Sequence, residues 1–336
     1  MKTYRIHEFG GFDGLRLDEL PTPSPGPGQV LVRVRAVSLN YRDLLVLKGF
    51  YNKNFPLPAV PLSDAAGEVV EVGDGVTRVK VGDRVAPIFM QTWLAGELAE
   101  AHGKSALGGA TEGVLAEFVV LHENGLVLLP KHLSFEEGST LPCAAVTAWN
   151  ALFVAGNIKA GDTILTQGTG GVSLFALQFA KLAGATVIAT SSSDEKLERV
   201  LNMGAAAGIN YKTTPDWEKR VRELTGGRGV DLVVEVGGAG TLSKSLHAVR
   251  TAGQISLIGV LAGGAAEINT LPILMRAIEV RGIFVGSRAM FEAMNRALDA
   301  HELRPVIDRV FPFQETPAAF RHMESAAHFG KIVIRV

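Results

Sequence analysis

A glycine-rich turn between a predicted strand and a predicted helix most constrains how this chain can fold. Residues 163–166 read as a strand, Gly168, Gly170 and Gly171 follow, and a helical pattern covers residues 172–182. Glycines let a backbone turn tightly and approach a pyrophosphate, and the start of a helix offers free N–H groups and a positive dipole end. Ser173 stands where a third glycine is usual. The segment predicts a dinucleotide-binding turn, with a plain structural turn as the alternative.

From about residue 144, strand-like segments alternate with helical ones. Further strands are predicted over residues 186–190, 231–236, 254–258 and 280–285. Helices are predicted over residues 194–203, 215–224 and 241–249. This alternation is typical of a parallel sheet with right-handed crossovers.

The first 140 residues follow a different pattern. Short apolar segments are interrupted by Gly and Pro, as in residues 29–37, 66–72, 78–85 and 113–121, which is typical of a barrel or sandwich. A terminal strand at residues 331–335 needs a sheet to join, and the sheet of the first domain is the expected host. We predict an α/β chain with one domain at residues 1–143 and 286–336 and a second at residues 144–285.

Composition excludes several classes of protein. The chain has 336 residues, of which 47% are hydrophobic, enough for two domains with sizeable cores. Its net charge of -1 gives no overall field for binding nucleic acid, so no such partner is expected. No apolar segment has the length of a membrane span and no signal peptide is visible, so we expect a cytoplasmic protein without a membrane partner. The single cysteine, Cys143, excludes an internal disulfide and a four-cysteine zinc site.

The end of the second strand of the alternating region bears on the choice of dinucleotide. An NAD site expects Asp or Glu there to bind the ribose 2′-OH, but this strand ends in Ser191, Ser192 and Ser193. Hydroxyl groups and the nearby Lys196 suit a 2′-phosphate, so NADP(H) is favoured over NAD(H). The alternative is that Ser193 only caps the next helix and that Lys196 is a solvated surface charge.

Several motifs follow one another in a specific order and spacing. They are residues 28–34, Asn40-Tyr41-Arg42-Asp43, residues 61–69, Gly82-Asp83-Arg84-Val85, residues 141–149, the glycine turn and residues 330–334. In this order the chain resembles the medium-chain dehydrogenase/reductase superfamily over essentially its whole length. The resemblance implies a GroES-like β-barrel catalytic domain and a Rossmann domain, a doubly wound parallel sheet that binds the cofactor.

The chain departs from the zinc alcohol dehydrogenases of that superfamily at the metal-ligand positions. Those enzymes use Cys, His, Glu and Cys, whereas this chain has Asn40, Ser63, Asp64 and Cys143. One thiolate and one carboxylate are too few for a catalytic zinc site. Residues 89–112, which would bind a structural zinc, contain no cysteine. The chain therefore resembles the zinc-free branch, with quinone oxidoreductases and 2-enoyl reductases as relatives, and we interpret Cys143 as a core residue. A metal held by Asp64, Cys143 and waters is the alternative.

The resemblance also implies roles for individual residues. The candidate catalytic residues are Asn40, Tyr51 and Asp43, with Asp43 expected to hold the local backbone rather than to act as a base. Tyr41 and Trp93 are the substrate-binding candidates. The cofactor-binding candidates are Thr147, Gly168, Gly170, Gly171, Val172, Ser191, Ser192, Lys196, Tyr211, Gly237, Ile258, Gly259, Ser287 and Arg288. Structural roles are the alternatives for Asn40 as a turn residue, Tyr51 as a surface aromatic, Trp93 as a packing residue and Arg288 as a salt-bridging residue.

We therefore predict an NADP(H)-dependent oxidoreductase without zinc, which transfers hydride to or from a small carbonyl, enone or quinone substrate. The apolar strand at residues 277–285 would form an open sheet edge, which predicts a homodimer. One alternative is a non-enzymatic NADPH-binding relative with a structural or nucleic-acid-binding role. Another is a zinc-type alcohol dehydrogenase with a degenerate metal site.

Overall fold

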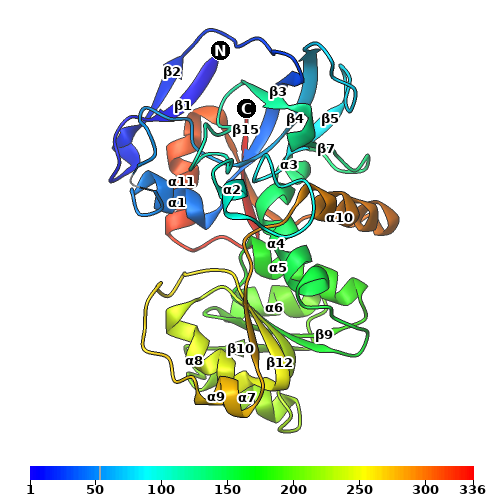
Figure 1. The fold of residues 1–336 in the computed structure, drawn as a ribbon. Coiled ribbons are helices and arrows are strands. Elements are labelled where there is room, and N and C mark those ends of the chain that lie inside the picture. Colours follow the sequence, from blue (N-terminus) through cyan, green and yellow to red (C-terminus); the bar gives the residue numbers. More distant parts are fainter. Residues whose placement is uncertain (53) are drawn as a thin grey trace. The chain divides into compact units, whose positions relative to one another are not determined.

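The chain folds into two compact units in this computed structural model, which describes residues 1–52 and 54–336 (Figure 1). One unit consists of Met1–Val146 and Gly286–Val336, and the other of Thr147–Val285. They are described in turn. No helix within the described residues has the length and apolar character needed to cross a membrane.

The second unit is built on a six-stranded sheet in which all neighbouring strands are parallel. Its strands are β8 (Thr163–Gln167), β9 (Thr186–Ser191), β10 (Ala207–Asn210), β11 (Val230–Glu235), β12 (Val249–Leu257) and β13 (Glu279–Gly282). Their order in the sheet is β10-β9-β8-β11-β12-β13. The chain therefore runs outward from β8 in one direction and then returns to β11 to run the other way. This reversal creates a topological switch point between the carboxyl ends of β8 and β11.

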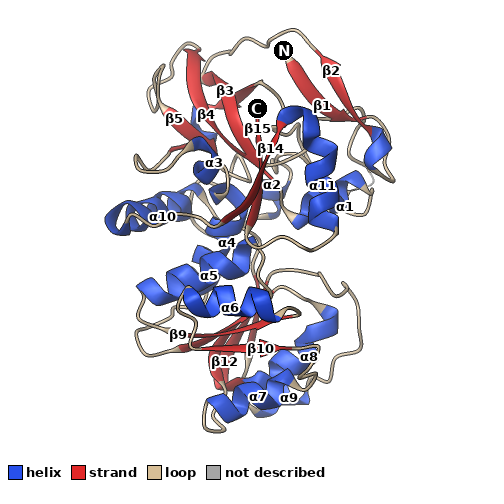
Figure 2. Cartoon of the chain, turned by 180° about the vertical axis from the view of Figure 1, so that it is seen from behind, coloured by secondary structure: helices blue, strands red, loops and turns tan. Residues whose placement is uncertain are grey.

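Helices cover both faces of this sheet (Figure 2). They are α5 (Gly171–Leu182), α6 (Asp194–Asn202), α7 (Trp217–Leu224) and α8 (Ala239–Ala248). Figure 2 shows α5 and α6 on one side and α7 and α8 on the other, with the short α9 (Leu271–Met275) beside them. Strands covered on both faces are apolar in their middle, as in Leu232-Val233-Val234, and the core includes Leu165, Ile188, Val233 and Ile255. The predicted parallel sheet is confirmed, while the short strand β10 was not predicted.

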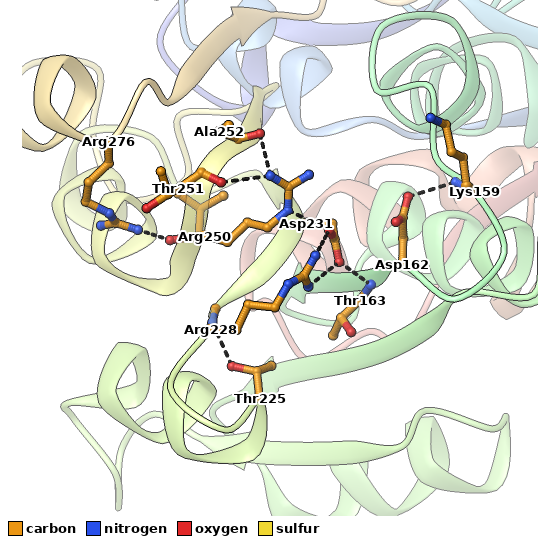
Figure 3. A network of polar contacts seen from close by, with 12 residues as sticks. Lys159, Asp162, Thr163, Thr225, Arg228, Asp231, Arg250, Thr251, Ala252 and Arg276 are labelled. Carbon is orange, nitrogen blue, oxygen red and sulfur yellow. Dashed lines mark hydrogen bonds and ion pairs between the residues drawn. The ribbon is translucent and has the colours of Figure 1, made fainter.

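Asp231 holds the amino-terminal edge of the sheet together (Figure 3). Its carboxylate accepts hydrogen bonds from the Thr163 N–H at 2.8 Å, from both terminal nitrogens of Arg228 at 2.9 and 2.5 Å, and from Arg250 Nε at 2.6 Å. These partners belong to β8, to the loop before β11 and to β12. One buried carboxylate thus ties together the starts of three neighbouring strands.

The first unit is built on a mainly antiparallel sheet. Its strands are β14 (Ile307–Pro312), β15 (Lys331–Arg335), β3 (Gln29–Ser38), β4 (Asp64–Val72), β5 (Arg84–Pro87) and β7 (Leu126–Leu128) in that order, with β6 (Phe118–His122) also paired to β3. A separate pair is formed by β1 (Lys2–Ile6) and β2 (Leu15–Glu19). The prediction that the terminal strand joins the sheet of the first domain is confirmed, because β15 pairs with β3.

The helices of this unit are short except for α10. They are α1 (Tyr41–Leu47), α2 (Glu100–Gly103), α3 (Phe135–Gly138), α10 (Arg288–His301) and α11 (Thr316–Glu324), and α4 (Val146–Trp149) lies at the junction with the second unit. The strand predicted at residues 78–85 is wrong over most of its length, because β5 begins only at Arg84. The preceding residues form a turn instead, in which Asp83 accepts a hydrogen bond from the Lys80 N–H at 2.9 Å and Gly82 has a φ of 90°.

Candidate active site

The carboxyl ends of β8, β9, β11 and β12 lie along one edge of the parallel sheet, where ligands bind in open α/β sheets. Gly168 follows β8, Gly237 follows β11, and Ile258 and Gly259 follow β12. Ser191 is the last residue of β9. Most of the predicted cofactor-binding residues are therefore brought to one edge of the second unit.

The glycine turn leaves open space above the start of α5. Gly168 has a φ of 67°, which favours glycine, and its N–H donates to the Thr190 carbonyl at 2.8 Å. Gly170 caps the helix with a φ of -80°, which any residue adopts. A Cβ added at either glycine would meet no atom within 4 Å. No neighbouring atom of the chain therefore requires a glycine at Gly170. The open space beside the N–H groups that begin the helix can hold a pyrophosphate.

Ser173 has its own structural role in place of the third glycine. Its buried hydroxyl donates to the Gln167 carbonyl at 2.6 Å and so fastens the first turn of α5 to the end of β8. The imperfect motif therefore still forms a strand–turn–helix unit.

Across the switch point, a buried carboxylate orders the turn after β11. Glu235 Oε1 accepts hydrogen bonds from the N–H groups of Gly237 at 2.8 Å and Gly238 at 3.0 Å, and from the Thr241 hydroxyl at 2.5 Å. Its Oε2 accepts from Gln167 Nε2 at 2.7 Å and from the Ser245 hydroxyl. Glu235 is fully buried and links β11 to the end of β8. The sequence analysis missed Glu235 and Gln167, although an acidic residue that ends an apolar strand was a visible signal.

At the tip of β9 the serines have different partners. Ser191 is buried and its hydroxyl accepts from the Ser193 N–H at 3.3 Å, while the Ser193 hydroxyl accepts from the Lys196 N–H at 3.3 Å and caps α6. Ser192 and Lys196 are half-buried. Tyr211 is exposed, and its N–H donates to the Ser191 carbonyl at 3.0 Å. The capping role considered for Ser193 is therefore present, alongside two hydroxyl groups, a lysine and a tyrosine at one strand end.

The other cofactor candidates are dispersed. Thr147 is buried in α4, and Val172 lies in the first turn of α5. Ser287 and Arg288 belong to the first unit, where the Ser287 hydroxyl caps α10. Arg288 Nη1 donates to the Asn124 carbonyl at 3.0 Å, and its Nε lies 3.5 Å from Glu292. These contacts match the salt-bridging alternative for Arg288.

In the first unit, a buried polar cluster surrounds the start of α1. Asn40 is the residue just before this helix and is 9% exposed, and Asp43 is fully buried three residues later. Asp43 Oδ2 accepts from the Asn40 N–H at 2.8 Å, and Oδ1 accepts from Arg42 Nη1 at 3.2 Å. Burial raises the pKa of Asp43 to about 6 although Arg42 and the Asn40 N–H oppose it. The expectation that Asp43 holds the local backbone agrees with these hydrogen bonds.

Lys331, the first residue of β15, places an amino group inside this cluster. Its side chain is 3% exposed, and Nζ donates to the Leu39 carbonyl at 2.6 Å and to Asn40 Oδ1 at 2.7 Å. Asp64 Oδ2 lies 3.9 Å from the same nitrogen. Burial lowers the pKa of Lys331, while the Asp64 charge opposes that shift. The sequence analysis missed this residue, although a lysine beginning an otherwise apolar strand was a signal.

Of the four positions that the resemblance aligns with zinc ligands, Asn40 and Asp64 lie within 4 Å of the Lys331 amino group, and Ser63 and Cys143 contact Asp64. Asp64 Oδ1 accepts from the Ser63 hydroxyl at 2.7 Å, and Oδ2 accepts from the Cys143 N–H at 3.1 Å. Burial and the Asp64 charge raise the pKa of the Cys143 thiol well above its usual range. Within the described part of the chain, no three His, Cys, Asp or Glu side chains are grouped so that they can hold a metal ion.

The predicted aromatic residues lie in different environments. Tyr41 is exposed on the first turn of α1, and Tyr51 is half-buried with its ring centroid 4.6 Å from the Arg42 guanidinium. Trp93 is buried, donates from Nε1 to the Gly96 carbonyl at 3.0 Å and stacks on His102. Trp93 thus has the contacts of a packing residue, whereas Asn40, Asp43, Arg42 and Tyr51 are neighbours.

Comparisons with known proteins agree with this architecture. The family of the alcohol dehydrogenase GroES-like domain matches residues 26–131, and that of the zinc-binding dehydrogenase matches residues 171–300. A zinc-type alcohol dehydrogenase-like protein of Schizosaccharomyces pombe is 46% identical over 341 residues, covering 99% of each chain. The quinone oxidoreductase of Rattus norvegicus is 28% identical over 343 residues, covering 99% of this chain and 97% of its own. The crystal structure of an NAD-dependent alcohol dehydrogenase is 35% identical, with a TM-score of 0.92 and 100% of both chains covered.

This chain therefore belongs to the medium-chain dehydrogenase/reductase superfamily. The predicted α/β fold, with a GroES-like domain and a Rossmann-type parallel sheet, is confirmed. The chain is an oxidoreductase of a family that acts on small molecules with a nicotinamide dinucleotide.

Proposed function

We propose that the chain is a zinc-independent, NADP(H)-dependent oxidoreductase of the cytoplasm. It transfers hydride to or from a small carbonyl, enone or quinone substrate. The observation that carries this proposal is the Lys331 amino group, 2.7 Å from Asn40 Oδ1 and 3.9 Å from Asp64 Oδ2, among the positions that bind zinc in relatives.

The donor set does not fit a catalytic zinc ion. Such a site needs three protein ligands with an open fourth position. Here Asn40 and Ser63 are weak ligands, and both Asp64 oxygens already accept hydrogen bonds. A lysine ammonium in the same cluster also repels a divalent cation.

The cofactor residues support NADP(H). Gly168 and Gly170 leave room for the pyrophosphate, and Ser192 after β9, Lys196 in α6 and Tyr211 after β10 suit a 2′-phosphate. No carboxylate ends that strand to bind an unphosphorylated ribose. We also propose Thr147, Gly171, Val172, Ser191, Gly237, Ile258, Gly259, Ser287 and Arg288 as cofactor-binding residues.

Residues of the first unit would donate hydrogen bonds to the substrate and would define the shape of its binding site. When bound, the reduced nicotinamide supplies the hydride. Asn40 and Tyr51 are proposed as hydrogen-bond donors to the substrate oxygen, which gains negative charge as the hydride arrives. Asp43 would hold Asn40 and the start of α1 in place, and Tyr41 and Trp93 would shape the substrate site.

A titration of the purified chain with NADPH and NADH, read by nucleotide fluorescence, tests the cofactor, and metal analysis of the same sample tests the metal. We expect preferential NADPH binding without stoichiometric zinc, followed by turnover of quinones, enones or aldehydes that a chelator does not reduce. Stoichiometric zinc with chelator-sensitive activity refutes zinc independence. The absence of turnover across the whole panel refutes the catalytic proposal.

A pair of variants tests the 2′-phosphate contact. Lys196→Met should weaken NADPH binding by about 10-fold, the magnitude of one charge-assisted hydrogen bond, and leave NADH binding unchanged. Lys159→Met is the matched control, because exposed Lys159 lies in the loop before β8, at the opposite edge of the sheet. An equal loss for both nucleotides contradicts the NADP(H) assignment.

The free edge of the six-stranded sheet supports a homodimer. β13 is the last strand, and exposed Leu271, Leu274, Met275 and Phe284 lie in or near α9 and β13. Exposed apolar side chains near an edge strand favour association with a second copy. Light scattering should give a dimer mass for the wild type and a monomer mass for Leu274→Asp, and a monomeric wild type at micromolar concentration contradicts the proposal.

A further inference from the structure

The oxygen and the nitrogen of the Asn40 side-chain amide differ in their hydrogen bonding. Its Oδ1 accepts from Lys331 at 2.7 Å, whereas Nδ2 is buried and has no hydrogen-bond partner among the described residues. A buried N–H donor without a partner destabilises the folded chain. Native chains seldom keep such a group without a function, and Asn40 is 9% exposed, so the donor is held inside the unit rather than in solvent.

Lys331 determines which end of the amide is free. An ammonium group carries three donors and no acceptor, so it selects the amide oxygen and turns Nδ2 away from itself. Nζ is held in turn by the Leu39 carbonyl at 2.6 Å and faces Asp64 at 3.9 Å. The lysine thus has oxygen neighbours from the segment before α1 and from the first residue of β4, all within one unit.

We propose that Lys331 is a positioning residue for Asn40, fixing the amide so that Nδ2 donates a hydrogen bond to the carbonyl-type oxygen of the substrate. This inference rests on the proposed function and adds the residue that orients the donor. The resemblance aligns Asn40 and Asp64 with zinc-ligand positions, and in this chain the amino group of Lys331 lies beside both side chains.

The chemistry requires a donor of this kind. When the hydride, with its two electrons, bonds to the substrate carbon, the π electrons of the carbonyl or conjugated system move to the oxygen. The substrate would be reduced by the two electrons that a bound reduced nicotinamide supplies, and its oxygen would then take a proton from water. A fixed N–H group stabilises the charge that develops on this oxygen, and because its direction is set beforehand it need not reorganise during the reaction.

Asn40→Asp removes the donor and is expected to fold, because a carboxylate beside Lys331 forms an ion pair. We expect kcat to fall by about 100-fold or more, as when one donor to a developing oxyanion is removed, with NADPH affinity little changed. Asn202→Asp, at the exposed end of α6, is the matched control. A kcat in Asn40→Asp within about threefold of the wild type overturns the proposal.

Lys331→Met removes the charge and the donors while keeping the length of the side chain. We expect a comparable loss of kcat, partial recovery in Lys331→Arg, and no loss in the exposed control Lys131→Met. In the double variant Asn40→Ala with Lys331→Met, the second change should cost little further, because Lys331 acts through Asn40. Losses that multiply would instead mean that Lys331 acts independently, and would overturn the proposal.

Crystal structures supply a test that does not depend on activity. In the wild type the Asn40 oxygen should face Lys331, and in Lys331→Met the amide should rotate or become disordered. An amide that keeps its orientation without the lysine refutes the positioning role, even if the wild type proves inactive. If Lys331→Met does not fold, two measurements remain. The kcat of Asn40→Asp tests the donor, and the crystal structure of Lys331→Arg tests the orientation of the Asn40 amide. If the proposed function itself is wrong, the wild type shows no turnover. That result differs from the structural result that refutes the positioning role.

Discussion

Replacing Asp231 by Asn should destabilise the second unit, because this carboxylate joins the starts of β8, β11 and β12 (Figure 3). It is 6% exposed and accepts hydrogen bonds from the Thr163 N–H, from two nitrogens of Arg228 and from Arg250 Nε, at 2.5 to 2.9 Å. An amide of the same shape keeps one acceptor oxygen and turns an NH₂ group toward a guanidinium. Asp231→Asn therefore loses charge-assisted hydrogen bonds without creating a cavity.

The expected loss in the free energy of unfolding depends on how far the hydrogen-bond partners of Asp231 are exposed to solvent. A hydrogen bond to a charged group contributes about 1.5–3 kcal/mol. The Arg228 side chain is 54% exposed, so solvent weakens its interaction with Asp231. The Arg250 side chain is 30% exposed, so its interaction with Asp231 is weakened less. We expect a total loss of about 3 kcal/mol in the free energy of unfolding. For a unit of this size that lowers Tm by roughly 6–12 °C.

The effect should also depend on pH in a defined direction. Burial alone would raise the pKa of Asp231, but the hydrogen bonds from Arg228, Thr163 and Arg250 outweigh it and hold the pKa well below the usual range. A lowered folded-state pKa contributes stability above the ordinary pKa of about 3.9, and that contribution is lost as the pH falls toward the folded value. The difference between wild type and Asp231→Asn should therefore be largest near neutral pH and shrink below about pH 4.

Urea unfolding followed by circular dichroism at pH 7, 5 and 3 measures these differences. Glu223→Gln is the control, because it breaks an exposed ion pair with Arg220 and should change stability little. A loss below about 1 kcal/mol for Asp231→Asn at pH 7, or a difference that stays constant down to pH 3, would refute the account of this network.

Three further predictions concern other sites. The Cys143 thiol, whose pKa burial raises, should react with iodoacetamide at pH 8 at least about 100-fold more slowly in the native than in the unfolded chain, and rapid native labelling seen by mass spectrometry would contradict this. Glu235→Gln should cost about 2 kcal/mol in urea unfolding and weaken NADPH binding, because an NH₂ group replaces an acceptor that orders the turn after β11. Gly108→Ala should lower Tm by clearly more than Gly75→Ala, because both glycines have positive φ but only the first would place its Cβ within 2.7 Å of Leu62 backbone atoms, and equal shifts would contradict the packing argument.

Periodicity predicted the second unit better than the first, for physical reasons. Strands of a parallel sheet are covered on both faces, so residues 231–236 have an apolar centre at Leu232-Val233-Val234 between helical segments, and the observed β11 (Val230–Glu235) differs by one residue at each end. In the first unit the strands differ widely in length, and the pairing of β3 with β4 contains register shifts. The Lys80–Asp83 turn interrupts a β-branched segment that resembles a strand when only composition is considered.

The glycine turn was predictable because its function depends on the backbone of a few consecutive residues. Gly168 and Gly170 lie where the local pattern placed them, between β8 and α5. The role of Ser173 was not predictable from the motif, since it depends on a hydroxyl that reaches back to the Gln167 carbonyl.

The cluster around Lys331 could not be predicted from any local pattern, because sheet register assembles it. Ser38 pairs with Val333 of β15 on one side and with Asp64 of β4 on the other, so the residues just beyond Ser38 come next to Lys331 and Asp64. A shift of one residue between β3 and β15 would turn the Lys331 side chain to the opposite face of the sheet and leave Asn40 Oδ1 without its partner. The orientation of the Asn40 amide therefore depends on a pairing between residues almost three hundred positions apart in the sequence. Asn40 and Asp64 stand at positions where the resemblance aligns zinc ligands, and their role becomes clear only together with Lys331. The sequence motif at residues 330–334 identified Lys331 only as part of a closing strand.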